Sequence, residues 1–440
     1  MEILIKAVQL ILSLSILVLV HEFGHFIAAK VFKTRVEKFY LFFDPWFSLF
    51  KFKKGETEYG IGWLPLGGYV KISGMIDESM DKEQMKLPPQ PHEFRAKPAW
   101  QRLIIMLGGV TVNIILAILI YILMLTMWGE QYLPTSEVNK YGIAVDSTGR
   151  QLGLTDGDKI ISVDNENIED FHKIPKKIIL DKSASIQIVR DEKPLEIQIP
   201  KGFISKLLQK NNADFISFRT PFIAAKFSDN SNAQKAGMKV DDRVIGINGI
   251  TTPYYDQYRT EIAKFKNQKV KLAVIRGSDT IQLDVQVNKE GIIGVYNKAF
   301  EQFFTLNKKE FNFFQAIPAG TMKAYVGIGD YLKSLRLLKE PKAYENVGGF
   351  LRIGDLFPAI WDWEAFWKLT AFLSIMLAIL NILPIPALDG GHVLFLLYEM
   401  VSRRKPSDKF LEYAQIVGMV LLFALLIFAN GNDIIRLFRH

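Results

Sequence analysis

Long runs of hydrophobic residues divide this chain into membrane-spanning and polar parts. Four runs are long and apolar enough to cross about 30 Å of hydrocarbon, at approximately residues 3–29, 103–128, 369–400 and 411–428. The third run is broken at Pro384 and Pro386 and then continues as an apolar segment, 393–400. No small-residue cleavage site follows Val20, so we interpret the first run as a retained span and not as a signal peptide. The pattern predicts a multi-span α-helical membrane protein with four transmembrane helices.

The distribution of lysine and arginine predicts how these spans are oriented. Eleven of these residues flank the span ends within 30–102 and 401–410, whereas five flank the opposite ends. Positive residues favour the cytoplasmic side of a membrane. We therefore expect 30–102 and 401–410 to be cytoplasmic. Both termini and the long stretch 129–365 should lie outside the cytoplasm.

The stretch between the second and third runs contains an internal repeat. Residues 152–165 align with 236–249 at an offset of 84, and each copy is a Gly-rich turn followed by a β-branched strand. Another strand pattern follows each copy. Two copies predict two similar β-rich domains, extracytoplasmic and inserted between spans 2 and 3, which we place at 129–211 and 212–300.

The repeat resembles PDZ domains, which can bind an extended peptide by adding it to a sheet edge. The alternative is a pair of spacer domains without a ligand. Asp241 stands where the first copy has Gly157, so the two copies need not bind alike. Residues 301–365 mix aromatic and charged residues, which predicts an amphipathic segment at the membrane interface. The remaining parts, 1–128 and 366–440, would form the membrane core.

Composition narrows the class of protein further. The chain is 49% hydrophobic yet 23% charged, which fits membrane spans joined to polar domains. The net charge of +8 is explained by the cytoplasmic loops, so we expect no nucleic-acid partner. The absence of cysteine excludes a disulfide scaffold, a Cys-ligated metal and a thiol nucleophile.

The end of the first run carries the residues with the clearest chemistry, in the sequence HEFGH. His21 and His25 are four residues apart, so on a helix both imidazoles lie on one face and can reach one ion. Glu22 lies beside them, where it can take a proton from a metal-activated water. A polar cap at the end of a span is the alternative. The run continues in apolar residues, however, and buried polar groups in lipid need partners.

A catalytic zinc site usually has three protein ligands, so one more is required. His92 and His172 lie in polar segments, and His440 is the last residue. Asp389 lies in the Pro- and Gly-interrupted part of the third run, where an ionisable residue is a functional-site candidate. The predicted orientation brings it to the cytoplasmic depth of the histidine pair. A simple Asp-Gly turn is the alternative interpretation, and His392 is the next candidate ligand.

The motif HEFGH in the first span, together with NILPIPALDGGH in the third, resembles the site-2 protease family of intramembrane zinc metalloproteases. The resemblance covers essentially the whole chain and is closest to bacterial RseP-type members, which carry tandem PDZ domains. It implies a zinc-dependent endopeptidase of the bacterial inner (cytoplasmic) membrane, with one zinc ion, active in regulated intramembrane proteolysis and stress response. The implied partners are the lipid bilayer and single-span membrane proteins pre-trimmed by another protease, among them anti-sigma factors and remnant signal peptides.

The resemblance also implies roles for individual residues. By position, Glu22 would be the catalytic acid and base, and the zinc ligands would be His21, His25 and Asp389. Asn381 falls at the family's substrate-contacting asparagine, although it could instead be an amide that packs helices together. The substrate-guiding, membrane-dipping β-loop of the family is matched by Gly67, Gly68, Tyr69 and Val70.

Two positions depart from the family's pattern. Val110 replaces a frequent proline ahead of Asn113, which removes a kink from the second span. Phe350 follows a Gly-Gly pair where many members have proline. Neither change alters a predicted ligand.

Two rival functions use the same residues. A membrane metal transporter or sensor would bind metal without hydrolysis, but it has no need of an unligated carboxylate such as Glu22. A peptide-binding scaffold with an inactive site is argued against by the intact HEFGH and LDG motifs.

Overall fold

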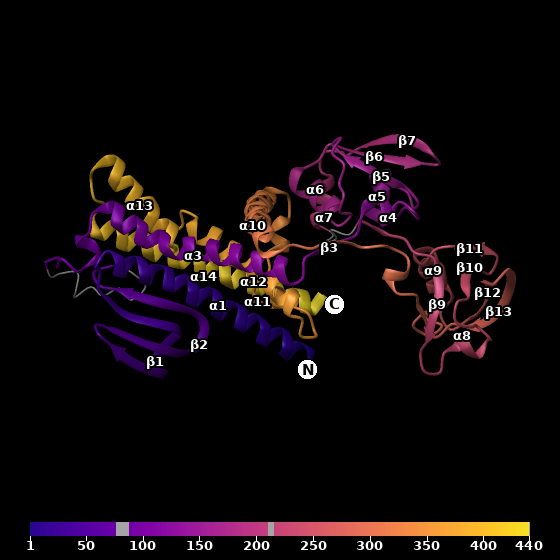
Figure 1. Ribbon diagram of the computed structural model, residues 1–440, viewed down its shortest axis with the longest axis horizontal. Helices are drawn as coiled ribbons and strands as arrows, with labels where there is room; N and C mark the ends of the chain where they lie inside the picture. The colour runs from indigo at the N-terminus through magenta and orange to yellow at the C-terminus, as the bar shows by residue number, and fades with distance from the viewer. Residues whose placement is uncertain (76–87, 210–214, 440) are drawn as a thin grey trace. The chain divides into compact units, whose positions relative to one another are not determined.

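The computed structural model describes residues 1–75, 88–209 and 215–439 (Figure 1). The chain divides into two compact units. The membrane unit comprises Met1–Gly129, Glu310–Lys339 and Tyr344–His440. The β unit comprises Glu130–Lys309 and Glu340–Ala343. Each unit is described by itself.

Among the described residues of the membrane unit, four helices are long and apolar enough to span a bilayer, and they confirm the four predicted spans. They are α1 (Glu2–Val31), α3 (Ala99–Met127), α12 (Trp363–Ile382) and α14 (Asp408–Arg439). Helix α3 is central, because it packs against both α1 and α12 (Figure 1). It runs without interruption through Val110, as expected in the absence of proline.

The membrane unit also contains α10 (Phe313–Arg336), α11 (Phe350–Asp355) and α13 (Asp389–Ser402). The break in the third apolar run is real, because α12 ends at Ile382 and α13 begins at Asp389. Pro384 and Pro386 lie between them and cannot donate backbone hydrogen bonds. Asp389 therefore occupies the first turn of a helix, directly after an irregular loop.

An antiparallel hairpin of β1 (Val36–Lys54) and β2 (Thr57–Ile72) follows α1. The central segment 38–41 pairs on one side with 58–61 and on the other with 68–71. The segment 57–61 also pairs with 50–54. Among the described residues the strand order is therefore 50–54, 57–61, 38–41, 68–71, and the segment 68–71 forms an edge of this sheet.

In the part of the β unit that the structure describes, there are short helices and four separate sheets. Its strands are β3 (Glu130–Tyr132), β4 (Ile143–Val145), β5 (Lys159–Val163), β6 (Ser185–Arg190), β7 (Lys193–Gln198), β8 (Ile216–Phe218), β9 (Phe222–Phe227), β10 (Arg243–Ile247), β11 (Ile250–Thr251), β12 (Lys269–Arg276), β13 (Asp279–Gln286), β14 (Val295–Asn297) and β15 (Asn307–Lys309). Its helices are α4 (Thr135–Val138), α5 (Ser147–Gln151), α6 (Lys173–Asp181), α7 (Phe203–Gln209), α8 (Asn232–Lys235) and α9 (Tyr255–Ile262). The first copy of the repeat contains the sheet β5-β6-β7, and the second contains β13-β12-β10-β9-β14, with β11 paired to β10. The predicted boundary at 211/212 lies outside the described residues, and β8 beyond it pairs with β4 of the first copy.

Each copy of the repeat contains an ion pair between a buried aspartate and a partly exposed arginine. Asp158 in the first copy and Asp242 in the second each accept two hydrogen bonds from one guanidinium, Arg190 or Arg276. The same arginine also donates to a backbone carbonyl in each copy, at Gly153 and Gly237 respectively. The repeat seen in the sequence therefore corresponds to a repeated structural unit.

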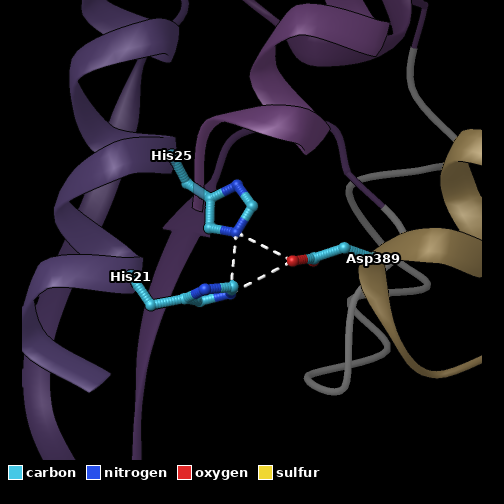
Figure 2. Close-up of side chains that lie close together, drawn as sticks. All are labelled: His21, His25 and Asp389. Carbon is cyan, nitrogen blue, oxygen red and sulfur yellow. Dashed lines mark hydrogen bonds and ion pairs between the residues drawn. The ribbon is translucent and has the colours of Figure 1, made fainter. Parts of the chain in front are cut away.

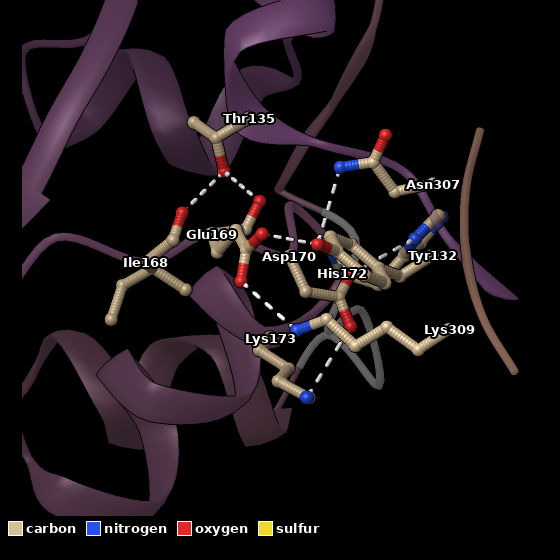
Figure 3. Close-up of polar contacts among 9 residues, drawn as sticks. All are labelled: Tyr132, Thr135, Ile168, Glu169, Asp170, His172, Lys173, Asn307 and Lys309. Carbon is tan, nitrogen blue, oxygen red and sulfur yellow. Dashed lines mark hydrogen bonds and ion pairs between the residues drawn. The ribbon is translucent and has the colours of Figure 1, made fainter. Parts of the chain in front are cut away.

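The ends of the β unit are joined to each other. Strand β3, where the unit begins, pairs antiparallel with β15, where its main segment ends. Figure 3 shows the polar side chains around this pair. Glu169 accepts hydrogen bonds from Tyr132 and from Lys309, and Thr135 donates to the carbonyl oxygen of Ile168 at 2.5 Å. The entry and exit strands are therefore fixed to the first copy of the repeat.

Candidate metal centre

The HEFGH motif lies where α1 crosses α3 at very short distance. A Cβ atom on Gly24 would lie 2.3 Å from the carbonyl oxygen of Gly108, and one on Gly108 would lie 2.5 Å from that of Gly24. Only glycine at both positions permits this contact. A Cβ on Gly109 would lie 2.5 Å from Nε2 of His25, so the imidazoles occupy the space above this residue. The crossing therefore presses the histidine pair against α3.

Three predicted ligands converge in this region (Figure 2). His21 and His25 extend from α1, and Asp389 extends from the start of α13. Oδ2 of Asp389 lies 3.1 Å from Nε2 of His21 and 3.2 Å from Nε2 of His25. The two Nε2 atoms are 3.2 Å apart. Among the described residues, these three form the group of metal-capable side chains whose ligand atoms lie within 4.8 Å of one another.

The donor set fits a zinc ion. Ligand atoms at about 2.0–2.1 Å from a tetrahedral ion lie roughly 3.3 Å from one another, close to the separations seen here. Nδ1 of His25 lies 2.8 Å from the carbonyl oxygen of Ile105. Because a carbonyl only accepts, Nδ1 carries the proton in the neutral imidazole, and Nε2 presents its lone pair to the centre of the group. Two imidazoles and one carboxylate are an established ligand combination for catalytic zinc.

A buried asparagine lies behind the other imidazole. The amide nitrogen of Asn113 on α3 lies 3.2 Å from Nδ1 of His21, and its oxygen Oδ1 is buried without a hydrogen-bond partner. A half-turn of this amide exchanges the two atoms, because they occupy nearly equivalent positions. Oδ1 then accepts from Nδ1–H of His21, and Nε2 is left free for a metal. That orientation satisfies the orphaned oxygen and the zinc-binding tautomer together.

The loop that carries Asp389 is tightly folded. A Cβ on Gly390 would lie 2.1 Å from the carbonyl oxygen of Leu383, and one on Gly391 would lie 2.7 Å from that of Ile385. The two glycines after Asp389 therefore allow α13 to begin directly against the end of α12. The local sequence DGG is explained by this close packing.

A cavity of about 840 Å³ opens beside the three side chains. Glu22 lines it together with His21, His25 and Asp389. His392, the alternative ligand, also lines the cavity. Asn381 near the end of α12 places its amide nitrogen 3.3 Å from Nε2 of His21. Of the predicted site residues, Glu22 and Asn381 therefore lie beside the three proposed ligands.

The sheet edge of the hairpin forms another wall of the same cavity, which is lined by Gly68, Tyr69 and Val70. A Cβ on Gly68 would lie 2.9 Å from Val18 of α1, so glycine lets the strand run against the helix. Tyr69 donates its hydroxyl to Asp44 at 2.8 Å. Burial, together with this hydrogen bond, raises the pKa of Tyr69, so its hydroxyl stays protonated. Gly67 instead packs against the ring of Phe43.

Sequence reasoning did not assign the groups behind the histidines. The carbonyl of Ile105 has no side-chain signal. Asn113 was noted only as part of a motif, and its contact with His21 depends on how α1 and α3 cross. Its spacing of four residues from Gly109 is the available signal, because these two positions share one face of α3.

Comparison with known proteins identifies the family. The sequence profile of Peptidase family M50 matches residues 9–425, nearly the whole chain. The chain belongs to Peptidase family M50. A similar protein from Salmonella typhimurium, named regulator of sigma-E protease RseP, is 27% identical over 99% of this chain and 100% of its own length. Relatives in Treponema pallidum and Campylobacter jejuni, at 26% and 28% identity over 99% and 98% of this chain, carry zinc metalloprotease in their names and are covered over 100% and 94% of their lengths.

Membership of family M50 decides between the functions that the sequence left open. The chain is a multi-pass membrane protein and a zinc-dependent intramembrane metalloprotease. A transporter or sensor without hydrolytic activity is not favoured.

Proposed function

We propose that this M50 peptidase cleaves the transmembrane segments of single-span membrane proteins in the cavity beside His21, His25 and Asp389. The observation that carries the proposal is the position of Glu22, which lines the same cavity as the three metal-capable side chains. These three residues would hold one zinc ion. When bound, zinc polarises water and stabilises negative charge on a carbonyl oxygen.

Glu22 would be the acid and base of the reaction. Its carboxylate takes a proton from the attacking water, which then adds to the peptide carbonyl carbon. The same carboxyl group donates the proton to the leaving amine when the C–N bond breaks. Asn381, whose amide nitrogen lies 3.3 Å from Nε2 of His21, would donate a hydrogen bond to substrate backbone. One water is consumed, and a new carboxyl end and a new amino end are formed.

The hairpin edge would receive the unwound substrate. A transmembrane helix satisfies its own backbone, and unwinding it in lipid exposes groups whose desolvation costs several kcal/mol each. The segment 68–71 forms a sheet edge beside the cavity. An extended substrate segment can pair with Gly68, Tyr69 and Val70 by strand addition. Gly67 would supply the turn that sets this edge in place.

The names of the relatives support a proposal for the class of substrate. The Salmonella typhimurium relative is named regulator of sigma-E protease RseP. We infer that substrates here are anti-sigma-factor-type proteins or remnant signal peptides, pre-trimmed by another protease. The bacterial inner membrane is the proposed location.

The two copies in the β unit would be PDZ-like domains outside the cytoplasm, with the metal centre toward the cytoplasmic side. The repeated turn, strand order and ion pair of the two copies support a shared domain type. Their proposed role is to exclude substrates that retain large external domains. They would thus govern which substrates are cut, and the chemistry would stay with the membrane unit.

The decisive experiment is Glu22→Gln in the purified full-length protein. The amide cannot accept the proton, so we expect cleavage of a pre-trimmed single-span substrate to fall on the order of 10³-fold. Zinc content should stay unchanged, because Glu22 is not a ligand. Glu2→Gln, at the exposed start of the same helix, removes the same charge and should cleave normally. Near-normal cleavage by Glu22→Gln would refute the mechanism.

A further inference from the structure

Helix α14 contacts the loop that carries Asp389. Most large side chains of this helix are exposed, as expected for a helix that faces lipid. Gln415 is an exception, with 5% of its surface exposed. Its Oε1 accepts a hydrogen bond, at 3.2 Å, from the backbone N–H of Ala387. Ala387 is two residues before Asp389.

Ala387 adopts a backbone conformation that needs support. Its φ is +77°, in the left-handed region that a residue with a Cβ rarely occupies. Such conformations persist where the surroundings hold them. Ala387 lies in the loop between α12 and α13, directly after Pro386, and its N–H group is outside both helices. In a membrane such a group requires an internal partner, and Gln415 supplies it.

A second position on α14 touches the preceding residue of the loop. Gly418 lies one turn after Gln415, and a Cβ on it would lie 1.8 Å from the carbonyl oxygen of Pro386. The α14 backbone therefore rests directly on Pro386. Two neighbouring residues of the loop are fixed from the same face of one helix. The next residues of the chain are Leu388 and the proposed ligand.

We propose that Gln415 is a positioning residue of the metal centre, which holds the 386–388 loop so that Asp389 faces the two imidazoles. Helix α14 supplies none of the proposed ligands, yet it determines how well the carboxylate is placed. The inference rests on the proposed role of Asp389 as a zinc ligand. Loss of outer supporting contacts at metal sites typically lowers metal affinity 10–100-fold.

Gln9 provides a matched control for the removal of a buried glutamine. It is fully buried on α1, and its amide nitrogen donates to the carbonyl oxygen of Pro358 at 2.9 Å. It precedes His21 by twelve residues, about 18 Å along the helix. Gln9→Leu therefore removes a comparable amide from the same unit without touching the Asp389 loop.

The test measures zinc affinity of the purified full-length protein by competition with a chelator. Gln415→Leu should bind zinc about 10–100-fold more weakly than wild type. Gln415→Glu keeps an acceptor oxygen at the same reach and should stay within about threefold of wild type, as should Gln9→Leu. The Co²⁺-substituted protein adds a readout independent of activity, because a displaced carboxylate changes the visible absorption of Gln415→Leu and not that of Gln9→Leu.

The outcomes separate this inference from the function on which it rests. Wild-type zinc affinity in Gln415→Leu, or equal weakening in Gln9→Leu, would overturn the positioning role. If Gln415→Leu does not fold, Gln415→Asn retains an amide with shorter reach and should show the same weakening; unchanged affinity there would also overturn the role. Asp389→Ala is measured in parallel: full zinc affinity in that variant would reject the ligand assignment itself. Weak zinc binding in Asp389→Ala beside normal binding in Gln415→Leu would reject only the present inference.

Discussion

The two units of the molecule both bury aspartates, but they surround them differently. In the β unit, Asp158 and Asp242 are 1% and 0% exposed, and each is held by a guanidinium through two hydrogen bonds of 2.7–2.8 Å. In the membrane unit, Asp389 directs one oxygen at two imidazole nitrogens.

The difference explains why one kind of buried carboxylate is structural and the other can bind metal. An arginine stays protonated and fills both carboxylate oxygens, so the pair is closed to any further ligand. A neutral imidazole instead offers a lone pair, so two imidazoles and a carboxylate leave an ion-sized space between them. The same kind of side chain therefore stabilises the fold in one unit and belongs to the candidate metal centre in the other.

The variant with the largest expected effect should change the candidate metal centre and leave the β unit unchanged. Asp389→Ala should abolish cleavage and weaken zinc binding by more than about 100-fold, since a ligand contributes more than an outer-shell partner. Hydrogen exchange in β10 and β12 should be unchanged. Asp355→Ala, an exposed aspartate of the same unit, is the control. Full zinc occupancy in Asp389→Ala would make His392 the first alternative ligand.

The reciprocal change is expected to affect stability alone. Arg276→Ala leaves the buried carboxylate of Asp242 without its partner and should lower the free energy of unfolding of the second copy by about 1–3 kcal/mol, because the guanidinium itself is partly exposed. Faster hydrogen exchange in β10 and β12 of the full-length protein measures this. Zinc content should not change. Lys298→Ala breaks a pair with the exposed Asp241 and should cost at most about 1 kcal/mol. Loss of zinc in Arg276→Ala would mean that the two settings are coupled.

A smaller effect is expected behind the histidine pair. Asn113→Leu removes the amide next to His21 and should weaken zinc binding about 10–100-fold. Asn113→Asp keeps an acceptor for Nδ1–H and should bind zinc better than the leucine variant. Chelator competition distinguishes the two. If the aspartate variant is as impaired as the leucine variant, the amide donates to His21, and the orientation favoured here is wrong.

The smallest effect is a pH dependence within the β unit. Burial opposes ionisation of Asp242, but the hydrogen bonds from Arg276 and from the Lys239 backbone outweigh it and lower its pKa. Because the pKa is lower in the folded state, the stabilisation is present above the unfolded value of about 3.9 and is lost as pH falls through the folded pKa. Unfolding free energies near pH 6 and pH 3 should therefore differ more in wild type than in Arg276→Ala. Equal differences would argue against this ion pair as the cause.

Much of the membrane unit could be predicted from the sequence, because lipid imposes strict local rules. Hydropathy and length locate the spans, and the two prolines locate the break ahead of α13. The spacing of His21 and His25 predicts one helical face without knowledge of any other element. The assignment of PDZ-like domains and of their boundaries stays a prediction.

The supporting contacts could not be predicted in the same way, because they arise where segments far apart in the chain meet. Asn113 and Gln415 are polar residues in long, mostly apolar helices, and such residues most often pack helices together. Their partners, His21 and Ala387, are set by helix crossings that no local pattern encodes. The roles proposed for Glu22, Asn381 and the ligands likewise stay predictions, although Glu22 and the three proposed ligands line one cavity and Asn381 contacts His21.

At the close crossing of α1 and α3, each residue type in HEFGH is required for a different structural reason. The two histidines supply nitrogen atoms that can bind a metal, and the glutamate supplies a carboxylate. The phenylalanine is 45% exposed and faces outward from the helix, as a lipid-facing side chain would. The glycine has no functional group. Glycine is required at this position because a Cβ atom would collide with Gly108. The motif therefore depends on a contact with a second helix, α3, which lies outside its five residues. A sequence search that requires only the two histidines and the glutamate would also accept chains in which a second helix cannot pack this closely.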